Sequence, residues 1–272
     1  MDAVEVRDPD DPRIADFRGV RDPEWLKRRR LFVAEGRQVI EIALAEPRLG
    51  PPDLLLTRVA LAALEPALRQ RRGDLRVFVA TPELMRAVGG YRFHQGALGV
   101  FPVPGKLELQ ALLAAGAAGR PLIAALEAVT NPDNVGSAFR NARAFGASGV
   151  LLDPRCAHPL YRKSLRTSMG AALRVPFVRA ADWPAALERL ASEGLVRVAL
   201  SPDPGGSDLD AAVEALASAA GLVLVLGHER DGLARETLAN CEWSVRIPMA
   251  EGVDSVNVAT ASGIALSRFA GL

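Results

Sequence analysis

The sequence predicts an α/β protein whose carboxyl-terminal part is built on a mainly parallel β-sheet. Two observations support this fold class: apolar runs of strand length recur after residue 120, and each run is followed by a segment of helical periodicity. The five runs are Leu122–Leu126, Gly149–Leu152, Val196–Leu200, Leu222–Leu226 and Trp243–Ile247. Strands that alternate with helices pair in parallel, and the helices then cover both faces of the sheet.

A smaller α/β region precedes this sheet. Its strand-like runs are Leu31–Val33, Leu54–Thr57 and Val77–Ala80, and its helical patterns are Gly36–Ala45 and Ala60–Arg71. Residues 102–120, which are rich in Pro, Gly and Ala, separate the two regions. We therefore predict an amino-terminal domain at residues 1–105, a linker at 106–119 and a second domain at 120–272.

Composition predicts a soluble globular protein of cytoplasmic location. With 272 residues, 49% of them hydrophobic and 24% charged, the chain is long enough to bury the cores of two modest domains. Apolar stretches such as Gly221–Gly227 are too short to cross a bilayer, and the acidic start Met1-Asp2 lacks a signal-peptide pattern. Cys156 and Cys241 have no paired spacing and no histidine cluster nearby, so we expect neither a disulfide framework nor a metal.

Basic residues are concentrated in two segments, although the formal net charge is only +1. Residues 17–37 carry seven basic and three acidic side chains, and residues 155–179 carry six basic and no acidic ones. Each segment alone suits an ordinary solvated face as well as a nucleic-acid surface. The side chains that we select as candidates for RNA contact are Arg28, Arg29, Arg30, Arg162, Lys163 and Arg166.

A parallel sheet binds its ligand at the carboxyl ends of its strands, where loops converge. The sequence contains neither a Walker-type phosphate loop nor a Gly-x-Gly-x-x-Gly turn after the first downstream strand. A nucleoside without phosphates is therefore the favoured class of ligand.

The first of three candidate stretches is residues 131–146. It predicts a helix that starts near Asn134 and is capped by Asn131 or Asp133. Taken singly, Asn134 and Arg140 also suit purely structural roles, as a cap and as a surface charge.

The second stretch is Leu226–Leu233, where an apolar strand stops at glycine and a charged loop follows. Gly227 permits the close approach of a flat ligand, or serves as a simple turn residue. Glu229 lies where a carboxylate commonly caps backbone amides or holds an arginine.

The third stretch runs from Arg246 to Ala261 and continues as a helix to Phe269. Pro248 ends the last strand because it cannot donate to the ladder, and Ser255 is the predicted cap of the helix. The helix is nearly all apolar, which predicts burial or an interface.

Together and in this order, the three stretches resemble the SpoU (TrmH-type) family of RNA ribose methyltransferases. The resemblance extends upstream to Phe32–Gly36 and His94–Ala97, so it covers nearly the whole chain. It implies a trefoil-knotted methyltransferase domain, S-adenosylmethionine as methyl donor, and a homodimer whose active site draws on both subunits. General rules make knots improbable, so that expectation depends on the resemblance alone.

The resemblance also implies roles for individual residues. The positions implied around the methyl donor are Leu226, Gly227, Ile247, Met249 and Val256. The positions implied for the catalytic group are Arg140, Asn134, Glu229, Ser255 and Asn257. Val256 and Ala259 depart from the leucine and the serine that are usual in the family, and both changes are conservative for a pocket lined by backbone.

Arg140 is implied as the catalytic residue, and the chemistry leaves two roles open for it. A guanidinium stays protonated, which makes the role of general base difficult. Holding a phosphate and stabilising the developing alkoxide is the alternative.

The resemblance thus predicts methyl transfer to a ribose 2′-hydroxyl of structured RNA. Ribosomal RNA is favoured over transfer RNA because an added substrate-binding domain is typical of the ribosomal branch. The alternatives are a non-catalytic RNA-binding protein of the same fold and an unrelated nucleotide enzyme. The joint presence of Asn134, Arg140, Glu229 and Asn257 argues against the first, and the missing phosphate motifs argue against the second.

Overall fold

The structure is a computed structural model that describes residues 3–71, 73–89, 94–113, 119–203 and 205–271. The chain forms two compact units, Met1–Gly105 with Leu160–Leu173, and Lys106–Pro159 with Arg174–Leu272. Residues 160–173 thus group with the first unit, although they lie within the stretch predicted as the second domain. Residues 114–118 of the predicted linker lie outside the described residues.

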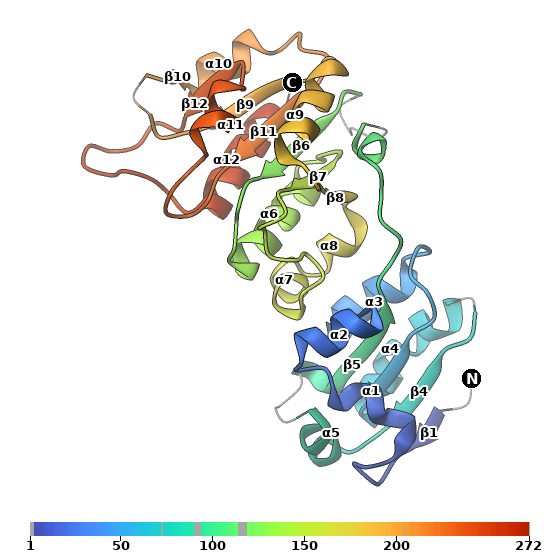
Figure 1. Cartoon of the computed structure of the whole chain (residues 1–272). Helices are drawn as coiled ribbons and strands as arrows, with labels where there is room; N and C mark the ends of the chain where they lie inside the picture. The colour runs from blue at the N-terminus through green and yellow to red at the C-terminus, as the bar shows by residue number, and fades with distance from the viewer. Residues whose placement is uncertain (1–2, 72, 90–93, 114–118, 204, 272) are drawn as a thin grey trace. The chain divides into compact units, whose positions relative to one another are not determined.

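The first unit contains a five-stranded sheet with the strand order β1-β4-β3-β5-β2 (Figure 1). The strands are β1 (Ala3–Glu5), β2 (Leu31–Glu35), β3 (Asp53–Leu56), β4 (Arg76–Val79) and β5 (Ala97–Pro102). β1, β4 and β3 are parallel, whereas β5 runs antiparallel to β3 and β2. The three predicted runs of this region are confirmed by β2, β3 and β4, and β1 and β5 add strands that the sequence analysis missed.

Helices pack around this sheet, in which β2 is an edge strand. They are α1 (Ala15–Arg18), α2 (Pro23–Arg29), α3 (Arg37–Ala45), α4 (Arg58–Gln70), α5 (Pro82–Gly89), α7 (Arg162–Thr167) and α8 (Ala171–Arg174), with 3-10 turns η1 (Pro12–Ile14) and η2 (His94–Gly96). α3 and α4 confirm the two predicted helical patterns. The helices α2, α3 and α7 all pack against β2. The side chain of Asp22 caps α2 by accepting hydrogen bonds from the backbone N–H groups of Glu24 and Trp25.

The second unit contains a seven-stranded, wholly parallel sheet with the order β10-β12-β9-β11-β6-β7-β8. The strands are β6 (Leu122–Leu126), β7 (Gly149–Leu152), β8 (Phe177–Arg179), β9 (Val196–Leu200), β10 (Ser207–Asp208), β11 (Leu222–Leu226) and β12 (Trp243–Arg246). The five predicted runs are confirmed, four of them to the residue. From β6 the order runs to β7 and β8 on one side and to the later strands on the other, so the topological switch point lies beside β6.

The helices of the second unit cover both faces of its sheet. They are η3 (Leu109–Leu112), α6 (Pro132–Ala144), α9 (Trp183–Ser192), α10 (Leu209–Ala215), α11 (Arg235–Ala239) and α12 (Val258–Phe269). One core joins alternate residues of β6 and β11 to α9, with Ile123, Val223 and Leu187 among its members. α12 packs lengthwise against α6 (Figure 1), and Asn141 of α6 donates a hydrogen bond from Nδ2 to the Ala259 carbonyl at 2.8 Å.

Two helix starts differ from the predictions. α6 begins at Pro132 rather than near Asn134, because the side chain of Asn131 caps it by accepting from the backbone N–H of Asp133. The predicted cap of the last helix, Ser255, is wrong. Asn257 takes that role by accepting from the backbone N–H of Ala259 at 2.8 Å. Asn is among the strongest N-cap residues, so the cap lies two positions later than predicted.

His158 gives the second unit a specific response to acid. Its ring stands edge-on to Phe177, and burial, together with the positive charge of Arg179, lowers the pKa of His158 from 6.5 to about 4. The unfolded chain therefore binds more protons than the folded one between these values, so stability falls as the pH drops from about 6.5 to about 4. We expect the wild-type protein to lose about 2 kcal/mol from this group between pH 7 and pH 5.

Replacement of His158 by phenylalanine removes this proton site. The free energy of unfolding of His158→Phe, measured by urea denaturation, is expected to decline less between pH 7 and pH 5 than that of the wild type. Equal declines would show that this histidine does not carry the acid response.

Candidate active site

A cavity of about 330 Å³ opens at the carboxyl ends of β9, β11 and β12. Three loops enclose it: the residues after β9, the loop 227–233 after β11, and the segment 247–256 after β12. Apolar side chains from the strand ends form part of the wall, and polar residues of the β11 loop form another part. Ligands of parallel α/β sheets bind at this end of the strands.

All five residues implied around the methyl donor line this cavity, namely Leu226, Gly227, Ile247, Met249 and Val256. The predicted residues Glu229 and Ser255 line it as well. The sequence analysis missed Leu200–Pro202, which lines the cavity from β9. Only the strand order, which puts β9 beside both β11 and β12, reveals this contribution.

Gly227 lies where the β11 loop folds back on itself. The backbone N–H of His228 donates to the carbonyl of Gly232, and the N–H of Gly232 donates back to the carbonyl of His228, both at 3.0 Å. A Cβ atom at residue 227 would lie 2.3 Å from the carbonyl carbon of Gly232 and 2.4 Å from the nitrogen of Leu233. No side chain fits here unless this cavity-lining loop moves.

Glu229, Asn134 and Asn257 form a polar chain across the three predicted stretches. Asn134 donates from Nδ2 to Glu229 Oε1 at 2.8 Å, and Asn257 donates from Nδ2 to Asn134 Oδ1 at 3.1 Å. Partial burial raises the pKa of Glu229, but the hydrogen bonds from Asn134 and from the backbone of Asn131 outweigh it, so the net pKa lies below the ordinary value. The carboxylate is thus held ionised at the cavity wall.

Comparison with known proteins identifies the family. The profile of the SpoU rRNA Methylase family matches residues 121–267. An uncharacterized tRNA/rRNA methyltransferase of Mycobacterium tuberculosis is 37% identical over 97% of this chain and 91% of its own length. The chain belongs to the SpoU family.

Solved structures show the same fold. The AdoMet-bound rRNA methyltransferase of Sinorhizobium meliloti aligns with a TM-score of 0.79 at 24% identity, covering 98% of this chain and 97% of its own. The SpoU methyltransferase AviRb of Streptomyces viridochromogenes, in complex with AdoMet, aligns with a TM-score of 0.78 at 22% identity, covering 96% and 98%. These two alignments cover both units of the present chain.

Arg140, the catalytic residue implied by the SpoU motifs, lies apart from the cavity wall. It is exposed on α6, and among the described residues its side chain makes no hydrogen bond or ion pair. The structure therefore brings together Asn134, Glu229 and Asn257 but leaves Arg140 free to contact another molecule.

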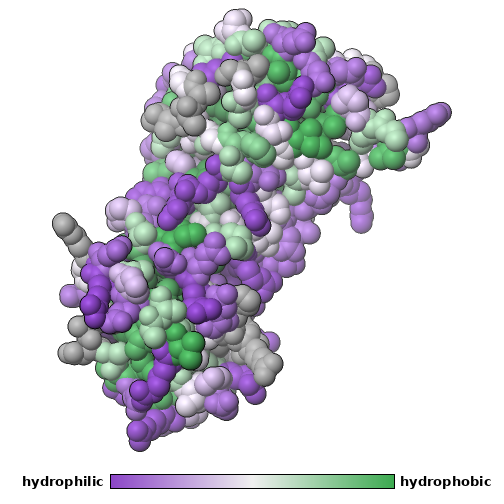
Figure 2. Space-filling model, turned by 180° about the vertical axis from the view of Figure 1, so that it is seen from behind, coloured by the Kyte–Doolittle hydropathy of each residue, from purple (hydrophilic) through white to green (hydrophobic). Residues whose placement is uncertain are grey.

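The six basic residues predicted to contact RNA lie in the first unit and differ in how far other side chains engage them. Arg29 is engaged, pairing with Asp16 at 3.1 Å and stacking over the ring of Trp25, and Arg162 lies 3.5 Å from the buried Glu35. The candidates whose side chains are exposed are Arg28, Arg29, Arg30, Lys163 and Arg166. Hydrophilic residues cover much of the face seen in Figure 2, interrupted by small apolar patches.

Within the part of the chain that the structure describes, no cluster of three His, Cys, Asp or Glu residues could hold a metal ion. Over the same residues, no helix has the length and apolar character required to cross a membrane.

The polar chain makes a prediction about pH. Asn134→Ala removes the hydrogen bond that helps keep Glu229 ionised, so the pKa of Glu229 rises. We expect the acid limb of the pH–rate profile for RNA methylation to move to higher pH, with a rate loss of about tenfold at neutral pH. Ser137→Ala on the same helix is the matched control. An unshifted acid limb in Asn134→Ala would mean that Asn134 only stabilises the fold.

Proposed function

We propose that this protein transfers the methyl group of S-adenosylmethionine to a ribose 2′-hydroxyl of structured RNA, with ribosomal RNA favoured over transfer RNA. The observation that carries the proposal is the cavity at the ends of β9, β11 and β12, where the five positions implied around the methyl donor meet beside the Glu229–Asn134–Asn257 chain. The AdoMet-bound neighbours of the same fold support the choice of donor. An RNA substrate also favours a cytoplasmic location.

The cavity suits S-adenosylmethionine in size and in lining. Its volume of about 330 Å³ falls within the range of small-molecule pockets. Leu226, Ile247 and Met249 offer an apolar surface for a purine ring, and the backbone of the β11 loop offers donors and acceptors for the ring edge. Bound there, the donor supplies a methyl carbon that its sulfonium charge already activates.

The protein's remaining task is to align one hydroxyl and to help remove one proton. We assign Arg140 to the phosphate beside the reacting sugar and to the charge that develops on the 2′-oxygen, because a guanidinium keeps its own proton. Glu229 lies at the cavity wall and orients Asn134 and the backbone N–H of Asn131, both of which donate to its carboxylate. Ser255 lines the cavity, and Asn257 anchors the end of the same segment by capping α12 and by donating to Asn134.

We propose that a second copy of the chain completes the active site. Arg140 does not line the cavity. Val256, which lines it, is 36% exposed, and Val253, three residues earlier in the chain, is 48% exposed. A homodimer would cover these apolar side chains and bring Arg140 of one copy to the cavity of the other. Sedimentation is expected to give twice the mass of the chain, and a monomer at working concentrations would contradict this arrangement.

We also propose that the carboxyl-terminal segment is knotted. After β12 at one side of the sheet, the chain contributes to the cavity wall and then ends as α12 on α6, the helix that follows β6. Threading beneath the β11 loop would give the trefoil path that the SpoU motifs imply.

Methyl transfer to separated RNA fractions tests the function. Purified protein with methyl-labelled S-adenosylmethionine is expected to label ribosomal RNA, and nuclease digestion should recover the label as a 2′-O-methylnucleoside. Label in transfer RNA instead would identify transfer RNA as the substrate. Label on a base would contradict ribose methylation. RNA binding without any transfer would identify a non-catalytic RNA-binding protein.

A further inference from the structure

A second cavity, of about 320 Å³, lies beside the first at the carboxyl ends of β6 and β7. Its wall includes Glu127, Thr130, Arg155 and Ala234. Four residues of the β11 loop line both cavities: His228, Asp231, Gly232 and Leu233. One loop therefore separates the proposed donor cavity from this neighbour, which has no role in the function proposed above.

A buried carboxylate distinguishes the second cavity. Glu127 is only 2% exposed, and its Oε1 is 3.4 Å from the N–H of Ala234 and 3.5 Å from Nη2 of Arg155. The other oxygen, Oε2, is buried and has no hydrogen-bond partner among the described residues. A buried carboxylate oxygen is costly to leave unpaired, so Oε2 requires a donor that the described residues do not supply.

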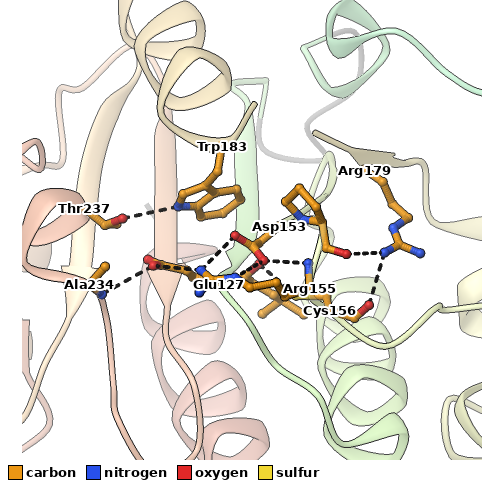
Figure 3. Close-up of polar contacts among 10 residues, drawn as sticks. Glu127, Asp153, Arg155, Cys156, Arg179, Trp183, Ala234 and Thr237 are labelled. Carbon is orange, nitrogen blue, oxygen red and sulfur yellow. Dashed lines mark hydrogen bonds and ion pairs between the residues drawn. The ribbon is translucent and has the colours of Figure 1, made fainter. Parts of the chain in front are cut away.

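Arg155 is oriented at the rim by a second buried carboxylate. Figure 3 shows its guanidinium between Glu127 and Asp153. Nε and Nη2 of Arg155 donate to the two carboxylate oxygens of Asp153 at 3.0 and 3.1 Å. Asp153 is 3% exposed, whereas 63% of the Arg155 side chain is accessible. The cavity thus joins an acceptor in its wall, Glu127, to a charged donor, Arg155, and Thr130 also lines it.

This pattern favours a neutral, flat ligand over a cation. The guanidinium of Arg155 repels a cation, but it suits a carbonyl oxygen next to N–H donors. Guanine has that arrangement, because N1–H and the 2-amino group are donors and O6 is an acceptor on one edge. Proteins read RNA by such edges when a base leaves its stack, and a pocket of this size holds one nucleoside.

We propose that the second cavity binds a guanine base of the substrate RNA, with its N–H edge on Glu127 and its carbonyl toward Arg155. This inference depends on the proposed function, since it adds a base-reading site beside the methyl donor. The base would be the target or a neighbour, held while the sugar reaches the donor cavity.

Nucleoside binding tests the inference without methyl transfer. The full chain is first saturated with S-adenosylhomocysteine to fill the donor cavity, and guanosine is then titrated and followed by ligand-observed NMR. We expect guanosine to bind, inosine and 1-methylguanosine to bind about tenfold more weakly, and Glu127→Gln to weaken guanosine binding about tenfold. The first analogue lacks the 2-amino group, and the second lacks N1–H.

A steric variant covers the case in which Glu127→Gln fails to fold. Ala234 is exposed and lines only the second cavity, so Ala234→Phe should block guanosine while S-adenosylhomocysteine still binds. Ala239→Phe, also exposed on α11 but outside both cavities, is the matched control.

The outcomes separate the two proposals. Absence of guanosine binding, equal affinity in Glu127→Gln or Ala234→Phe, or binding of spermidine with the same dependence on Glu127 would overturn the guanine site. Each of these results leaves the methyltransferase function intact as long as S-adenosylhomocysteine binds. Failure of the wild-type protein to bind S-adenosylhomocysteine would contradict the methyltransferase function instead.

Discussion

Replacement of Arg140 by alanine is expected to lower the rate of RNA methylation by about 10²–10³-fold, with unchanged affinity for S-adenosylmethionine. The side chain is exposed and, among the described residues, makes no hydrogen bond or ion pair, so its removal breaks no polar interaction of the fold. The loss should therefore fall on the transfer step and on RNA affinity. Single-turnover transfer to ribosomal RNA, with donor binding followed by calorimetry, measures the two separately.

Two further variants assign the role of Arg140. Arg143→Ala, exposed three residues later on α6, is the matched control and should retain activity. Arg140→Lys keeps a positive charge without the planar fork, so it should retain part of the activity if Arg140 holds a phosphate and the developing alkoxide. If lysine instead restores activity only at high pH, the side chain acts as a base. Full activity of Arg140→Ala would remove Arg140 from the mechanism.

The fold was predictable from sequence where strands are buried on both faces. β6, β7 and β11 are continuous apolar runs in which every residue is buried, and turn residues or charges define their ends. Two of the missed strands, β8 and β10, lack that signal, whereas β5 is a buried apolar run that the sequence analysis did not select. β10 is only Ser207–Asp208, and β8 is three residues of which none is fully buried, so their pairing depends on neighbours distant in sequence.

Only those parts of the candidate site that lie within the three sequence motifs were predictable from the sequence. The second and third stretches both contribute residues to one cavity, because parallel strands end at the same edge of the sheet. The first stretch reaches this site only through Asn134, which hydrogen-bonds to Glu229 and Asn257. The contribution of Leu200–Pro202 and the whole second cavity were missed, since both require the strand order. In the sequence, Glu127 looks like the end of an apolar strand. Its functional interest emerges only from its burial and from the lack of a partner for Oε2 within the described part of the chain.

Gly227→Val is expected to weaken the binding of S-adenosylmethionine by about 100-fold or more. The added Cβ alone would lie within 2.5 Å of three backbone atoms of residues 232–233, so the β11 loop must move out of its paired geometry. That loop supplies His228, Glu229 and Gly232 to the cavity wall, so its displacement reshapes the donor site. Calorimetric titration of the donor into the variant measures the loss.

The matched control is Gly105→Val, because a Cβ at this exposed position meets nothing within 4 Å. Thermal denaturation of both variants separates a local change at the β11 loop from general unfolding. Gly227→Val that keeps a cooperative transition yet loses the donor would tie binding to the backbone path after β11. If this folded variant bound the donor as tightly as wild type, the cavity at β9, β11 and β12 would not be the donor site, and the position of the transferred methyl group would have to be sought elsewhere in the fold.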